Sequence, residues 1–141
     1  MKAQQAGYSG TPLSKKLGIS VNNRVVCKNE PSEFHALLEP LPNGVVFESK
    51  VTNETDLVHV FEIDRAALTK ALTGLREKIR SDAVVWVSWP KKASKVPTDI
   101  TEDTIRQVAL PLGFVDIKVC AINEVWSGLK LVIRKELRDL P

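Results

Sequence analysis

Cysteine and histidine are scarce in this 141-residue chain, long apolar runs are absent, and each lack excludes a class of protein. Two cysteines, Cys27 and Cys120, are too few for the disulfide framework of a small secreted protein. No apolar run approaches the roughly 20 residues that cross a bilayer. The first residues carry a charge but no apolar core, so they do not form a signal peptide. We therefore expect a cytoplasmic protein with no membrane partner.

Residues that commonly carry out catalysis show no recognisable arrangement. The only histidines are His35 and His59, and neither has a cysteine or carboxylate at metal-ligand spacing, so we expect no metal site. Nucleophile turns of the Gly-x-Ser-x-Gly type and phosphate-binding loops are absent. Asp64 could present a catalytic carboxylate, but helix capping explains its position. Cys27 is interpreted as a buried, reduced thiol, with a redox or catalytic role as the alternative.

The overall composition is that of an ordinary globular protein. Hydrophobic residues make up 43% of the chain and charged residues 26%, which excludes a disordered protein. The net charge of +3 is too small to indicate a dedicated nucleic-acid binder. The length predicts a single domain, which we place at residues 13–141, after a polar, mobile tail at residues 1–12.

Apolar runs alternate with helical patterns along most of the chain. In the clearest helix, Leu68, Leu72, Leu75 and Ile79 form an apolar stripe that begins after a capping residue, Asp64. Strands are expected at 24–27, 45–50, 57–63, 83–89, 114–122 and 129–135, and helices at 65–79 and 101–110, with short helical segments near 13–18 and 34–38. This order predicts an α/β fold, a three-layer Rossmann-like sheet that is mostly parallel and ends in an antiparallel hairpin.

Residues 24–135 resemble class I (Rossmann-like) methyltransferases. The resemblance rests on the closing part of the chain, which reads DAVVWVSWP, then TEDTIRQVALPLGF, then VDIKVCAI and LKLVIRKE. One strand–helix unit of those enzymes is missing between residues 50 and 57, where the connection is too short for a helix. The resemblance therefore implies a shortened methyltransferase core.

A second, finer resemblance is to a family of small bacterial domains of unknown function. It rests on three long segments, TPLSKKLGI, WVSWPKKASKVPTDITED and ALPLGFVDIKVCAINEVWSGLKLVIR. This family implies the same kind of fold and brings no established activity.

The loop after the first strand argues against the chemistry of the methyltransferases. Enzymes of that class need glycine there, so that the backbone can approach S-adenosylmethionine. Here the loop is Lys28–Asn29–Glu30–Pro31–Ser32, in which Glu30 adds a carboxylate and Pro31 removes an amide donor. We therefore expect no cofactor, and the missing glycines argue against catalysis without deciding it. Glu48 is the one matching residue, since such enzymes place an acid near this strand end for the ribose hydroxyls.

The strongest functional pattern is the cationic loop that follows the apolar run at 83–89. Ligands of open α/β sheets bind at the edge where the parallel strands end. Lysines there attract anions, and indole rings can stack on a base. The hairpin turn at 123–128 should share this edge and bring a second tryptophan to it. The predicted ligand-binding residues are Ser88, Trp89, Lys91, Lys92, Lys95 and Trp126.

Three functions follow from these observations. The preferred one is a cytoplasmic domain that binds an anionic small molecule or nucleotide at the loop after the fourth strand, without catalysis. One alternative is a divergent S-adenosylmethionine-type transferase that reaches its cofactor differently. The other is a protein-interaction module whose exposed tryptophans anchor a partner. A purely structural interpretation, with solubilising lysines and core tryptophans, also stays open.

Overall fold

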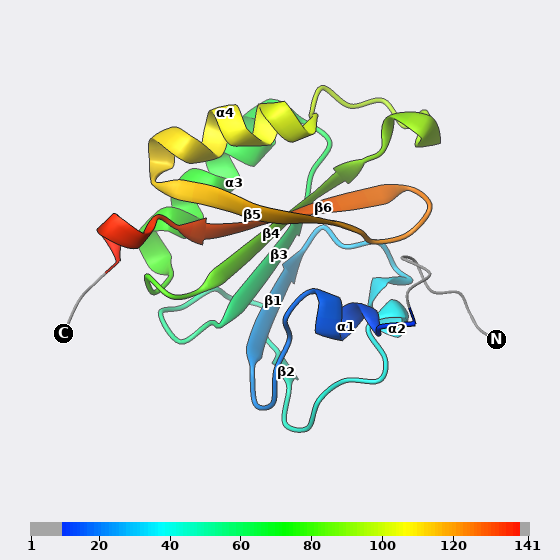
Figure 1. Cartoon of the computed structure of the whole chain (residues 1–141), viewed down its shortest axis with the longest axis vertical. Helices are drawn as coiled ribbons and strands as arrows, with labels where there is room; N and C mark the ends of the chain where they lie inside the picture. The colour runs from blue at the N-terminus through cyan, green and yellow to red at the C-terminus, as the bar shows by residue number, and fades with distance from the viewer. Residues whose placement is uncertain (1–9, 139–141) are drawn as a thin grey trace.

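The computed structural model describes residues 10–138, which form one six-stranded sheet with helices on both faces (Figure 1). The strands are β1 (Arg24–Lys28), β2 (Val46–Phe47), β3 (Leu57–Phe61), β4 (Val84–Pro90), β5 (Phe114–Ala121) and β6 (Trp126–Ile133). The helices are α1 (Leu13–Lys16), α2 (Phe34–Leu37), α3 (Arg65–Lys78) and α4 (Glu102–Leu112), with 3₁₀ turns η1 (Lys92–Ser94) and η2 (Lys135–Leu137).

The strands lie in the order β2-β1-β3-β4-β6-β5. The first four are parallel, whereas β6 is antiparallel to both of its neighbours, β4 and β5. This arrangement confirms the predicted α/β fold with its C-terminal hairpin. The chain passes from β1 outward to β2, then returns past β1 to build the rest of the sheet. The boundary between β1 and β3 is therefore the switch point of the topology.

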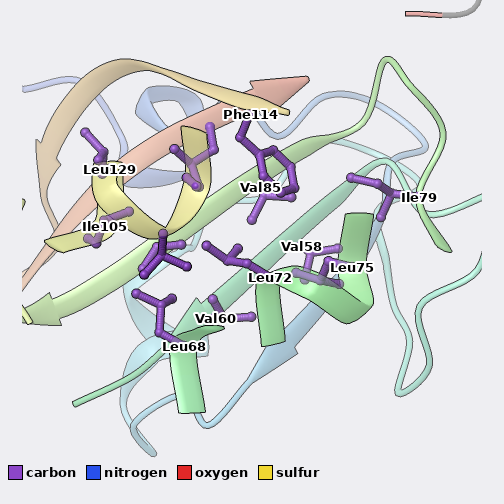
Figure 2. Close-up of a cluster of buried hydrophobic side chains, with 14 of the residues drawn as sticks. Val58, Val60, Leu68, Leu72, Leu75, Ile79, Val85, Ile105, Phe114 and Leu129 are labelled. Atoms are coloured by element: carbon purple, nitrogen blue, oxygen red, sulfur yellow. The ribbon is translucent and has the colours of Figure 1, made fainter. Parts of the chain in front are cut away.

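One face of the sheet is covered by α3 and α4, which lie side by side (Figure 1). The predicted stripe of α3 points at this face, where Leu68, Leu72 and Leu75 pack with Val58 and Val60 of β3 (Figure 2). Burial of such side chains is the main stabilising contribution in a domain of this size.

Local caps set the limits of both long helices. Asp64 accepts a hydrogen bond from the backbone N–H of Ala67 at 2.9 Å, which confirms its predicted capping role. Thr101 and Thr104 form a reciprocal capping box at the start of α4. Gly113 ends that helix with a φ of 104°, a left-handed conformation that glycine adopts without strain.

The opposite face carries α1 and α2 (Figure 1). Leu13, Leu17 and Phe34 from this layer are buried together with Trp86 of β4. The Trp86 indole N–H donates to the backbone carbonyl of Leu17 at 2.8 Å. Because α1 is only four residues long, it cannot be stable by itself, and this packing holds it on the sheet.

The front part of the sheet is reduced, as expected from the missing strand–helix unit. Residues 48–56, which connect β2 to β3, contain no helix and no strand. Right-handed crossovers are strongly preferred, so a helix in this connection would cover β1 on the face that holds α3. Only Val51 of this segment packs there. The predicted strand at 45–50 is wrong in length, because β2 pairs with β1 at two positions before the chain leaves the sheet.

Within residues 10–138, no helix is long and apolar enough to cross a membrane. Most of the tail predicted at residues 1–12 lies outside the described residues. Of that segment the structure describes the last three residues, and the Pro12 carbonyl accepts hydrogen bonds from Lys15 and Lys16 at the start of α1.

Candidate functional site

A groove of about 890 Å³ lies beside α3, on the sheet face where the β2–β3 connection lacks a helix. We call it the switch-point groove, and it is lined by Lys28, Asn29, Lys50, Val51, Val60, Glu62, Lys70, Ala71, Thr73, Gly74, Leu75 and Lys78. Lys28 ends β1 and is directly opposite Val60 of β3, so the groove begins where the two strands of the switch point end. In open α/β sheets this crevice is where ligands bind.

The lining of this groove is mainly basic, and its formal charge equals the net charge of the chain. Four lysines and a single acidic residue line it, which gives a formal charge of +3. The whole chain has 20 basic and 17 acidic residues. Outside the groove, sixteen basic and sixteen acidic residues remain, and their formal charges sum to zero. A cavity lined mainly by one sign of charge concentrates ligands of the opposite sign.

The side of the groove that α3 forms has small side chains in its middle and lysines around them. Ala71 and Gly74 lie in its middle, and a Cβ added at Gly74 would meet no atom within 4 Å. Lys70 and Lys78 flank them and are separated by about 12 Å along the helix axis. Glycine within a helix costs roughly 0.5–1 kcal/mol relative to alanine. No packing contact explains that cost at Gly74, and its effect is to widen the groove.

Glu62 is the acidic residue of the groove, and its side chain connects the end of β3 to the end of β1. The Asn29 side-chain amide donates to the Glu62 carboxylate at 3.3 Å. Burial raises the pKa of Glu62, the hydrogen bond from Asn29 opposes this shift, and the charge of Asp64 adds to it. Asn29 itself has a φ of 61°, in the left-handed region that asparagine tolerates. The loop after β1 thus makes a sharp turn without glycine.

The three lysines predicted to bind a ligand lie elsewhere on the sheet edge. Lys91, Lys92 and Lys95 follow β4 and do not line the groove. The Lys91 N–H donates to the Val125 carbonyl at 2.7 Å, which confirms that this loop and the β5–β6 turn share one edge. Lys92 and Lys95 are exposed. Binding by this loop stays a prediction.

The other residues predicted for that site are separated by the sheet. Trp89 is only 8% exposed and packs in the cluster under α3 and α4. Trp126 lies on the opposite face, half-buried, with its ring centroid 5.2 Å from that of Phe61. Ser88 is buried on the same face as Trp126, with its hydroxyl 2.7 Å from His59 Nε2. The two indoles therefore do not flank the lysines together.

Glu48, the predicted ribose-binding residue, lies beside β1 and not beyond its end. Its backbone N–H donates to the Val25 carbonyl at 2.8 Å. Its carboxylate forms an ion pair with Arg24 Nε at 3.4 Å and does not line the groove. Because β2 is so short, the acid falls level with the middle of β1. A cofactor role for Glu48 stays a prediction.

A second cluster of functional side chains lies at the end of β1, on the face of the sheet that α2 covers. Cys27, Glu30 and His35 each offer one ligand atom, and these three atoms lie within 4.8 Å of one another. Glu30 Oε2 is 2.9 Å from His35 Nε2. The expectation that His35 has no metal-ligating neighbour is therefore wrong. The turn at Asn29 brings residues three and eight positions after Cys27 back beside it.

Both acidic members of this group have shifted pKa values. Burial raises the pKa of the Cys27 thiol to about 12, and the charge of Glu30 adds to that shift. Burial also acts to raise the pKa of Glu30, but hydrogen bonds with His35 and with its own backbone, and the charges of His35 and Lys28, hold it below its ordinary value. Cys27 and Cys120 are free cysteines, and Cys27, which was expected to be buried, is partly exposed. Without a cation, Cys27 is a protonated and unreactive thiol.

The groove was not predicted, because a basic helix face such as that of α3 is usually only exposed to solvent. Two features of the sequence pointed to it. Ala71 and Gly74 interrupt that face with small residues, and the connection before β3 is too short to supply a covering helix.

The strand order, with an antiparallel β6 between β4 and β5, defines a class I methyltransferase-like fold. No family model and no curated protein matches the chain. Among solved structures 92 chains match. One is an S-adenosylmethionine (SAM)-dependent methyltransferase from Aquifex aeolicus, with a TM-score of 0.63 and 12% identity over 85% of this chain and 87% of that enzyme.

Two further methyltransferase structures align with this chain. The N-methyltransferase NodS from Bradyrhizobium japonicum WM9 aligns with a TM-score of 0.58 and 10% identity, over 86% of this chain and 93% of NodS. The O-methyltransferase NcsB1 from neocarzinostatin biosynthesis aligns with a TM-score of 0.63 and 15% identity, over 90% of this chain. This chain covers 53% of NcsB1, about half of that enzyme. At these identities the likeness shows the fold alone.

Proposed function

We propose that this protein binds an anionic small molecule, such as a nucleotide, in the switch-point groove, and does so without catalysing methyl transfer. One observation supports the proposal above all. The residues that line the cavity at the switch point have a formal charge of +3, which equals the net charge of the whole chain. The groove volume falls in the range of about 300–1,000 Å³ typical of small-molecule sites. Val51 and Ala71, which are partly exposed, supply apolar surface for a flat ring, and the lysines supply charge attraction.

Neutralising the groove lysines is expected to weaken binding of the anionic ligand about 10- to 100-fold, given up to about 1 kcal/mol per exposed charge pair. The variant is Lys50→Gln with Lys70→Gln and Lys78→Gln. A thermal-shift screen of nucleotides, sugar phosphates, acyl carboxylates and SAM identifies the ligand first, and calorimetric titration then measures its affinity. A ligand at 100 times its Kd adds about 2.7 kcal/mol of stability, which such a screen detects.

A matched control is available in the loop after β4. The variant Lys91→Gln with Lys92→Gln and Lys95→Gln removes the same three charges and is expected to leave the affinity nearly unchanged. Loss of binding in this control alone would move the site to the loop and contradict the groove. Equal losses in both variants would show that only the net charge matters.

Gly74 provides a second, geometric test of the groove. Gly74→Ala is expected to raise the free energy of unfolding by about 0.5–1 kcal/mol, because the helix gains a better former and the added Cβ meets open space. Gly74→Phe places a ring in the groove and is expected to abolish ligand binding. Urea unfolding and calorimetric titration measure the two effects. Unchanged affinity in Gly74→Phe would contradict the groove as the binding site.

A divergent SAM-type transferase is the second candidate, and it is favoured by the fold of the solved structures. Against it stand a loop after β1 without glycine and an α2 of only four residues. Titration with SAM separates the two candidates. Binding that survives the groove substitutions and is accompanied by methyl transfer would support the transferase.

The interaction-module alternative required Trp89 and Trp126 to be exposed, and the burial of Trp89 leaves only Trp126 partly accessible. Trp86 and Trp89 are buried and Trp126 is half-buried. The cytoplasm is the compartment that we propose, because free thiols persist in a reducing environment.

A further inference from the structure

The group formed by Cys27, Glu30 and His35 is separate from the switch-point groove. Cys27 packs with the cluster under α1 and α2, whereas the next residue, Lys28, lines the groove on the other face. We propose that Cys27, Glu30 and His35 bind one divalent transition-metal ion, and that Zn²⁺ is the ion they suit. We call these three residues the β1–α2 triad. This inference is independent of the proposed anionic ligand.

The distances of the triad permit a shared ion. Its three ligand atoms lie within 4.8 Å of one another. Zn²⁺ is bound at about 2.3 Å by sulfur and about 2.0–2.2 Å by nitrogen and oxygen, so its donors lie roughly 3.5 Å apart in a tetrahedral site. An inward movement of about 1 Å closes the set. The imidazole of His35 is 46% exposed, and the carboxylate of Glu30 is 27% exposed, so both can make this movement by rotating their side chains.

The donor types select the ion. A thiolate, an imidazole and a carboxylate are the three side-chain ligands that Zn²⁺ accepts, whereas Mg²⁺ and Ca²⁺ require oxygen. A thiolate and a carboxylate together balance the charge of a dication, and a bound metal deprotonates its thiol ligand. Three protein ligands leave a fourth position for water, which is the coordination of zinc sites that are open to a substrate.

The backbone holds the three ligands on fixed supports. Cys27 belongs to β1 and lies opposite His59 in the parallel ladder with β3. Asn29 turns the chain through the left-handed region, and this turn directs Glu30 back to the end of β1. The edge of the His35 ring meets Phe47 with the ring centroids 4.8 Å apart, which orients the imidazole. The strand therefore fixes the position of the thiol, and Glu30 and His35 adjust to the ion by rotating their side chains.

Cobalt provides a direct optical test. The untagged full-length chain is stripped with a chelator and titrated with Co²⁺. We expect one equivalent to bind, with a thiolate-to-cobalt charge-transfer band that Zn²⁺ displaces. Cys27→Ser is expected to abolish the band, and Cys120→Ser, the matched control on β5, is expected to retain it. A band that persists in Cys27→Ser, or the absence of any thiolate band in the native chain, would overturn the proposal.

Variants of Glu30 and His35 test the metal site even if Cys27→Ser fails to fold. Loss of an outer partner of a metal ligand costs 10–100-fold in affinity, so losing a direct ligand should cost at least about 100-fold. We expect Glu30→Gln and His35→Gln each to weaken Zn²⁺ binding by this factor in competition titrations. Glu33→Gln, the neighbouring carboxylate, should leave it unchanged. Native affinity in both Glu30→Gln and His35→Gln would refute the site.

Discussion

Replacing Trp86 with alanine is expected to lower the free energy of unfolding by about 3–5 kcal/mol. The side chain is fully buried in the central strand β4, where it lies between His59 of β3 and Lys130 of β6. Its removal leaves a cavity and deprives the Leu17 carbonyl of its donor at 2.8 Å. A domain of this kind is stable by only about 5–15 kcal/mol, so the variant should be close to unfolding. Urea unfolding followed by circular dichroism measures the change.

Two other variants separate the contributions. Trp86→Phe keeps most of the packing but loses the hydrogen bond, and should cost about 1–3 kcal/mol because a buried carbonyl is left without a donor. Trp126→Ala, the matched control in a half-buried position, should cost about 1–2 kcal/mol. Amide exchange at Leu17 should accelerate in both Trp86 variants, since α1 depends on this contact. A Trp86→Ala variant no less stable than Trp126→Ala would contradict the role assigned to Trp86.

The regular elements could be predicted because their determinants are local. The stripe on α3 and the cap at Asp64 are each recognised within a few residues of sequence, and both are confirmed. The apolar runs likewise located the strands. The length of β2 could not be predicted in this way, because it depends on where the chain leaves its neighbour β1 and not on its own composition.

The switch-point groove could not be located from any single local pattern, because it combines small residues on α3 with the absence of a covering helix before β3. The basic face of α3 resembles any solvated helix face until the β2–β3 connection is seen to leave β1 uncovered. Lys50 reaches the groove from that connection, whereas Lys70 and Lys78 reach it from α3. Only the three-dimensional crossover relates these residues to one another.

The tryptophans and the β1–α2 triad show two further limits of prediction from local sequence. Trp86 and Trp89 are three positions apart on one strand, so alternation alone places them on opposite faces. The face of Trp126 depends on the register of β6 against β4, in which Trp126 lies opposite Pro90. The triad depends on the left-handed turn at Asn29, and a spacing rule drawn from regular metal motifs does not include it.

Acid is expected to destabilise the fold through His59. Burial lowers the pKa of His59 to about 3, whereas an imidazole in the unfolded chain has a pKa near 6.5. Between these values the unfolded state binds more protons than the folded state. The stability contributed by the neutral imidazole is therefore complete above pH 6.5 and is lost as the pH falls toward 3, at about 1.4 kcal/mol per pH unit. From pH 7.5 to 4.5 the expected loss is about 3 kcal/mol.

The surroundings of His59 account for this shift. Its ring stacks on Phe61 with centroids 4.4 Å apart and meets the edge of Phe34 at 4.9 Å. Nε2 is 2.7 Å from the Ser88 hydroxyl, and Nδ1 has no hydrogen-bond partner within residues 10–138. A proton on Nδ1 would therefore place a charge in an apolar environment without a neutralising partner. This arrangement favours the neutral tautomer whose Nε2–H donates to Ser88.

His59→Gln is the informative comparison, because glutamine can keep the hydrogen bond to Ser88 but does not titrate. The stability of the native chain should fall by about 3 kcal/mol more than that of the variant between pH 7.5 and 4.5. Carboxylates titrate in both proteins, so the difference between them isolates His59. A chelator is included, since Cys27 lies opposite His59 in the sheet and metal binding would add its own pH dependence. If the two stabilities fall in parallel, the charged imidazole is accommodated in the fold. The apolar cluster around Phe34 and Phe61 would then have to open enough to admit water.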